Sequence, residues 1–143
     1  MAAVHYPYHL ERFVEAQEDV FAEVLDELRA GCKRGHWMWF IFPQMKGLGR
    51  SAAAAYYGIG SLDEAAAYLR HPVLGPRLVE CTQLVNEVED RTIHEILGSP
   101  DDLKFRSSMT LFARAAEDDT VFRAALKKYF GGEPDRLTLE LLR

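Results

Sequence analysis

Apolar residues recur at spacings of three and four along almost the whole chain, and signals for helix starts and stops bound these segments. Ser61 with Glu64 and Thr92 with Glu95 have the spacing of capping boxes, in which side chains satisfy the free backbone donors of a helix start. No segment alternates with period two for long, and no Asn-Gly or Asp-Gly hairpin turn occurs. The 143 residues therefore predict an all-α fold, a single compact multi-helix domain over residues 1–143.

The helical stripes also predict which side chains form the core. Residues that repeat on the apolar faces are expected to be buried, because each amphipathic helix must cover its apolar stripe. The predicted core residues are Phe13, Leu25, Leu28, Leu78, Val85, Phe105, Met109, Phe112, Phe122, Leu126 and Leu141. Further helix starts are predicted at Ser51, Pro100, Thr120 and Asp135, from capping residues and a proline at a first helical position.

The stretch HWMWFIFPQMKGLGRS, residues 36–51, is the densest apolar run in the chain. It is also the one strand candidate, since both faces of such a strand would be apolar. A lone strand would leave its backbone groups buried and unpaired. The sequence therefore predicts a short buried helix or turn that Pro43 ends.

Composition excludes several classes of function. A net charge of −5 argues against general nucleic-acid binding, and no apolar run approaches the roughly 20 residues that cross a bilayer. The first residues carry no export signal, and the two cysteines form no paired motif, so a reduced cytoplasmic location is expected. The five histidines show no metal-ligand spacing and no nucleotide-cofactor motif occurs, so we expect neither a metal nor a cofactor.

Five motifs in chain order resemble a known family: RFVEAQ, HWMWFIFPQMKGLGRS, AAAYLRHPVLGPRL, KFRSSMTLF and TLELL. Together they are similar to the bacterial domain of unknown function number 1810, over about residues 12–142. The resemblance implies an all-α fold and implies no activity or catalytic residues. Some members carry the label calpastatin, after a disordered protease inhibitor whose Thr-Ile-Pro-Pro core is absent here.

Charge placement points to a candidate anion site. No acidic residue lies between Leu28 and Leu62, whereas this interval holds five of the 17 basic residues. Within it, glycines accompany two cations in a loop before a helix start, an arrangement that favours a phosphate or carboxylate. The residues assigned to this loop are Lys46, Gly47, Gly49, Arg50 and Ser51. The alternatives are a solvated charged face and a capped loop whose glycines serve backbone geometry.

The aromatic run supplies a second part of the candidate site. Trp37 and Trp39 would form a wall on which a flat ring stacks, with His36 and Gln44 as polar groups at its ends. We expect one of the two tryptophans to border a cleft. The alternative is that both indoles lie in the core and that the two polar residues bond nearby backbone groups.

A third part comes from the segment DLKFRSSMTLF. Lys104 and Ser108 share one helical face with apolar residues, which is unusual for a core helix. They would form the opposite wall of the pocket, with Lys104 supplying a positive charge. Alternatively, Ser108 bonds the carbonyl four residues earlier and Lys104 extends to solvent.

Three functions remain open at this point, and the third is a structural or stress-related helper that binds no ligand. In the first, one pocket built from these residues binds a small, anionic, ring-bearing molecule of the nucleotide kind, with any reaction left open. In the second, the aromatic residues are core and an apolar helix face docks a protein partner. The sequence leaves the oligomeric state undetermined.

Overall fold

The computed structural model describes residues 8–143, and within this range it contains ten helices, 64% of the residues, and no strand. The helices are α1 (Glu11–Glu18), α2 (Phe21–Arg29), α3 (Met38–Ile41), α4 (Ala52–Tyr57), α5 (Leu62–Arg70), α6 (Leu74–Glu87), α7 (Ile93–Leu97), α8 (Asp101–Ala115), α9 (Thr120–Phe130) and α10 (Arg136–Leu141). The predicted all-α fold is confirmed.

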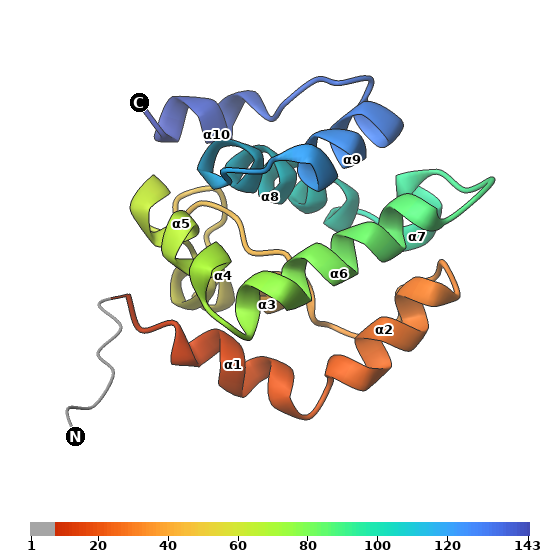
Figure 1. Cartoon of the computed structure of the whole chain (residues 1–143), viewed down its shortest axis with the longest axis horizontal. Coiled ribbons are helices and arrows are strands. Elements are labelled where there is room, and N and C mark those ends of the chain that lie inside the picture. The colour runs from red at the N-terminus through yellow and green to blue at the C-terminus, as the bar shows by residue number, and fades with distance from the viewer. Residues whose placement is uncertain (1–7) are drawn as a thin grey trace.

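Helix α8 is the central element of the fold. It packs against α3, α5, α7, α9 and α10, so neighbours cover several of its sides. Figure 1 shows α9 and α10 on one side of α8 and the α1–α2 pair along the opposite edge of the molecule. This position explains why even Ser108 and Thr110, polar residues of α8, are buried.

Several predicted helix starts are present at the expected residues. Ser51 and Asp135 accept hydrogen bonds from the backbone N–H three residues on, and Thr92 with Glu95 forms a complete capping box. The box predicted at Ser61 is only half formed. The Ser61 hydroxyl accepts from the Glu64 N–H, but the Glu64 carboxylate accepts from the Gly60 N–H instead of closing the box.

The aromatic stretch forms the short helix α3, and Pro43 follows it, as predicted. Beyond the proline the chain stays extended, and an isolated parallel bridge joins Met45 to Ile59. The Ile59 N–H donates to the Gln44 carbonyl and the Lys46 N–H donates to the Ile59 carbonyl, at 2.9 and 2.8 Å between the heavy atoms. These bonds fix the position of the loop that follows.

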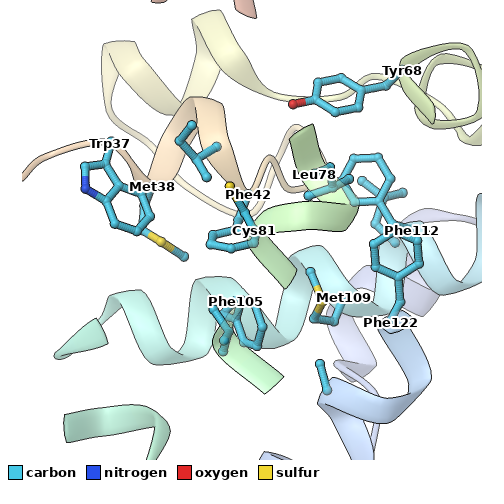
Figure 2. Packing of buried hydrophobic residues seen from close by; sticks show 14 of the residues in the cluster. Trp37, Met38, Phe42, Tyr68, Leu78, Cys81, Phe105, Met109, Phe112 and Phe122 are labelled. Carbon is cyan, nitrogen blue, oxygen red and sulfur yellow. The ribbon is translucent and has the colours of Figure 1, made fainter. Parts of the chain in front are cut away.

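The buried apolar side chains form one cluster around α8. In Figure 2, Met109 lies between Phe105 and Phe112 along α8, and the rings of Phe42 and Phe105 meet edge to face at 5.0 Å between centroids. Nine of the eleven predicted core residues are buried. The remaining two predictions are wrong: Leu25 is half-buried against the cluster, and Leu141 is 44% exposed because the last helix ends at the surface.

Arg12 anchors α1 to the segment between α4 and α5. Its five N–H groups donate to the carbonyls of Tyr8, His9, Tyr56 and Gly58 and to the Glu64 carboxylate, at donor–acceptor distances of 2.7–3.1 Å. The Arg12 and Glu64 side chains are both more than nine-tenths buried. A buried charge pair of this kind is tolerated because each polar atom has a partner.

Candidate functional site

A groove of about 330 Å³ lies where α3, the loop after Gln44, the start of α8 and the start of α10 meet. It therefore joins the aromatic stretch to the helix that carries Lys104, although these segments are far apart in sequence. Its lining residues are Trp39, Gln44, Leu48, Gly49, Pro100, Leu103, Lys104, Arg106, Ser107, Asp135 and Leu137.

The two tryptophans of the stretch have different environments. Trp37 is 3% exposed and its indole N–H donates to the Glu27 carboxylate, so it belongs to the core. Trp39 is half-buried and lines the groove. This is the arrangement expected of one core tryptophan and one tryptophan at a cleft.

Lys104 lies on the ring of Trp39, with its ammonium nitrogen 3.8 Å from the ring centroid. A cation on an indole face is attracted by the negative face of the ring. The same ammonium is 3.5 Å from the Asp101 carboxylate, which also pairs with Lys33 at 2.8 Å. One carboxylate therefore faces two ammonium groups, which leaves an excess of positive charge beside the groove.

Gln44 is a buried polar residue of the groove wall. Only 8% of it is exposed, and its side-chain amide makes no hydrogen bond to another residue in the range 8–143. Buried amides in native proteins normally have a partner. Because Gln44 lines the groove, its amide is available to bond solvent or a bound molecule.

Two further charged residues line the groove. The Arg106 Nε–H donates to the Glu133 carbonyl at 2.9 Å, which orients the guanidinium. The Asp135 carboxylate caps α10 by accepting from the backbone and the hydroxyl of Thr138. With Lys104 counted, the lining carries two positive charges against one negative charge.

Several residues assigned to the pocket from sequence do not line this groove. His36 is exposed and Trp37 is buried, and Lys46, Gly47, Arg50 and Ser51 lie outside its lining. This groove therefore does not contain all eleven assigned residues. The structure brings together four of them: Trp39, Gln44, Gly49 and Lys104.

Local geometry accounts for the glycine loop. Gly47 has a φ of +102°, which side chains rarely tolerate, and a Cβ at Gly49 would lie 2.8 Å from the Ala54 Cβ. The Ser51 hydroxyl accepts from the Ala54 N–H at 3.0 Å, which occupies the cap of a helix of only six residues. These observations favour the alternative of a capped loop over an anion site at Ser51.

Ser108 does not face the groove. Its side chain is buried, and its hydroxyl oxygen has no hydrogen-bond partner in the described chain. The neighbouring Ser107 lines the groove instead, and its hydroxyl donates to the Leu103 carbonyl at 3.2 Å. Sequence reasoning placed Ser108 on the apolar face of this helix, and the structure buries that face instead of opening it to the groove.

Lys46 lines a second, polar groove of about 340 Å³ with His9, Tyr56 and Arg12. All five donors of Arg12 are already used within the protein. This groove therefore has few free groups for a ligand, and we do not assign it a function.

The buried groups elsewhere are not arranged as reactive centres. Burial raises the pKa of the Cys81 thiol to about 12 and also raises that of the Tyr68 hydroxyl, so neither ionises near neutrality. No group of three or more histidine, cysteine or acidic side chains with metal-site geometry occurs in residues 8–143. Across the same residues, no helix is long and apolar enough to span a bilayer.

Sequence reasoning missed the residues that complete the groove: Leu48, Pro100, Leu103, Arg106, Ser107, Asp135 and Leu137. One signal was available on α8. Leu103, Arg106 and Ser107 are spaced by three and four, so they share a face of the helix that places a leucine beside two polar residues. Nothing in the sequence indicated that α10 would lie beside this face.

Comparisons with known proteins agree with the fold. The family described as "Protein of unknown function (DUF1810)" matches residues 7–142. The crystal structure of the conserved hypothetical protein Rv1873 from Mycobacterium tuberculosis is 61% identical, covers 96% of this chain and 98% of its own, and superposes with a TM-score of 0.95. A comparison with functionally curated proteins finds no match.

Proposed function

Since this chain belongs to the DUF1810 family, whose description states no function, we propose a function from the groove itself: the protein binds a small organic anion that carries a flat ring. The groove lined by Trp39, Gln44, Lys104 and Arg106 is the binding site in this proposal. The ligand is expected to be of the size class to which mononucleotides and aromatic acids belong.

The observation that carries the proposal is the placement of Lys104 on Trp39, at 3.8 Å from the ring centroid. A cation on an aromatic wall offers two attractions to one molecule, because its acidic group can meet the ammonium while its ring stacks on the indole. Ligand sites typically combine apolar walls with a few polar groups that fix orientation. Gln44, with an amide free of protein partners, is such a group.

The proposal concerns binding and assigns no reaction. Among residues 8–143, Ser107 is the one serine in the lining and no histidine lines the groove; the Ser107 hydroxyl donates to a backbone carbonyl. A nucleophile needs a nearby base to be activated. We further propose a reducing compartment such as the cytoplasm, which suits two free cysteines.

A thermal-shift screen tests the proposal. The wild-type chain is heated with ring-bearing phosphates and carboxylates, including AMP and phenyl phosphate, because a molecule that binds only the native state raises the Tm. At 100 times its Kd, a ligand adds about 2.7 kcal/mol to the free energy of unfolding. The expected result is a rise in Tm that Lys104→Met or Gln44→Leu abolishes.

The matched control is Lys127→Met, since Lys127 is an exposed lysine of α9 away from the groove. This variant should keep the full ligand-induced rise in Tm. A rise that survives Lys104→Met and Gln44→Leu would place the ligand elsewhere and reject the proposal. No rise with any ring-bearing anion would reject it as well.

A further inference from the structure

We infer that the ligand of the groove is a hydrophobic organic acid, meaning a ring or branched alkyl body that carries one carboxylate or phosphate, and not a nucleotide. This inference rests on the proposed function and narrows its ligand class. It follows from the apolar rim of the groove, from its small number of free polar groups and from its charge.

The two most exposed large hydrophobic side chains in residues 8–143 both line this one groove. Leu103 is 59% exposed and Leu137 is 60% exposed. They come from α8 and α10, which lie side by side (Figure 1). Single exposed leucines are ordinary, but two that border one groove form a surface that an apolar molecule would remove from water.

The apolar surface continues along α10. Leu141 is one helical turn beyond Leu137, is 44% exposed, and lies against the backbone of Gly47, where a Cβ would be 3.8 Å from its methyl carbons. Leu48 is half-buried and also lines the groove. Three of the five exposed large hydrophobic residues in the described chain therefore surround one loop.

The free hydrogen-bonding groups of the groove are few. The Ser107 hydroxyl and the Asp135 carboxylate already have protein partners, which leaves the Gln44 amide and the two cationic side chains. A nucleotide would bring ribose hydroxyls and base edges that need several partners, and polar groups left unpaired on binding cost affinity. An apolar body with one acidic group needs no more partners than the groove offers.

Charge and size point to the same class. The lining carries Lys104 and Arg106 against Asp135, an excess of one positive charge that matches a single acid. The volume of about 330 Å³ lies at the lower end of the roughly 300–1,000 Å³ typical of small-molecule sites. It suits one ring or a short alkyl group better than a base, a sugar and a phosphate together.

Isothermal titration of the full chain with five probes tests the inference. The probes are 3-phenylpropionate, phenyl phosphate, AMP, inorganic phosphate and the uncharged 3-phenylpropanol. We expect the first two to bind at least about tenfold more tightly than the other three, because only they satisfy the cations and the leucines together.

Variants of the rim identify the surface that is responsible. Leu103→Ser and Leu137→Ser should each weaken the binding of 3-phenylpropionate by about tenfold, which is the typical effect of removing an apolar contact from a binding pocket. Both positions are exposed, so the Tm of the free protein should stay near that of the wild type. The matched control is Leu62→Ser, since Leu62 is an exposed leucine of α5 outside the groove, and it should leave the affinity unchanged.

The outcomes separate this inference from the proposed function. If AMP binds and Lys104→Met abolishes its binding, while neither rim variant matters and the two hydrophobic acids do not bind, the inference is overturned and the proposed function stands. Inorganic phosphate that binds as tightly as phenyl phosphate also overturns the inference. If none of the ring-bearing anions binds the wild-type chain, both are rejected.

Discussion

The ammonium nitrogen of Lys104 lies 3.8 Å from the centroid of the Trp39 ring, and 65 positions separate these residues in the sequence. A second lysine–tryptophan pair lies nearby, because Lys33 is 5.1 Å from the ring centroid of Trp37. Asp101 pairs with both lysines. The start of α8 is thus held against the aromatic stretch, and the pairing of Lys104 with Trp39 forms one wall of the groove.

A double-mutant cycle of Lys104→Met and Trp39→Leu measures this pair. We expect a coupling free energy of about 0.5–1 kcal/mol in urea denaturation, because the ammonium is partly exposed and cation–π contacts at such sites are worth this much. The cycle Lys127→Met with Trp39→Leu is the control and should show no coupling. A Lys104–Trp39 coupling as small as that of the control would contradict the contact.

Arg12→Lys should lower the free energy of unfolding by about 2–4 kcal/mol, because an ammonium offers three donors where the guanidinium supplies five bonds. The buried carbonyls and the Glu64 carboxylate would lose partners. Chemical denaturation measures the loss. Arg136→Lys, at an exposed ion pair 3.3 Å from Glu140, should cost less than about 0.5 kcal/mol, and an equal cost in both variants would argue against the anchor.

Glu27 should make the stability of the protein depend on pH in the acidic range. Burial raises the pKa of its carboxyl group, but hydrogen bonds from the Gly35 and Arg34 amides and the Trp37 indole outweigh this and lower the pKa below its ordinary value of 4.5. Because the pKa of Glu27 is lower in the folded state, its carboxylate stabilises the fold fully at a pH above the ordinary pKa of 4.5. This stabilisation is lost as the pH falls through the lowered pKa of the folded state.

Glu27→Gln tests this dependence. The variant should be less stable than the wild type by about 1 kcal/mol at neutral pH, since an amide oxygen accepts the same bonds without a charge and the site remains partly open to solvent. The difference should shrink toward zero as the pH falls below the ordinary pKa and through the lowered pKa, where the folded wild-type carboxyl becomes neutral. Urea denaturation at several pH values measures it, and a difference that does not change with pH would refute the assignment.

Ser108→Ala should leave the free energy of unfolding unchanged or raise it. The Ser108 hydroxyl is buried and its oxygen has no partner among the described residues, so its removal relieves a desolvation cost without breaking a bond. Thr110→Val on the same helix is the control. It should cost about 1–2 kcal/mol, because the Thr110 hydroxyl donates to the Arg106 carbonyl and accepts from the Asp135 N–H. A loss above about 1 kcal/mol for Ser108→Ala would mean that its hydroxyl is bonded.

The sequence by itself determined the helical class, the family and most helix boundaries. Capping is a local interaction, and residues such as Ser51 and Thr92 bond backbone groups three positions on, whatever the rest of the chain does. The spacing of apolar residues also identified most of the core. The end of α3 just before Pro43 followed from the missing N–H of proline, and its helical form from the lack of a partner strand.

Only the tertiary structure decided which of these residues meet. Trp37 and Trp39 are equivalent in local pattern, yet Trp37 is covered in the core and Trp39 lines a groove that α8 and α10 also line. Thr110, on the other side of α8, is enclosed for a related reason: neighbours cover α8 on several sides, whereas helical periodicity assumes a single buried face. Burial and long-range contacts depend on elements that are distant in the chain. The spacing of residues within one helix does not indicate which distant elements pack against it.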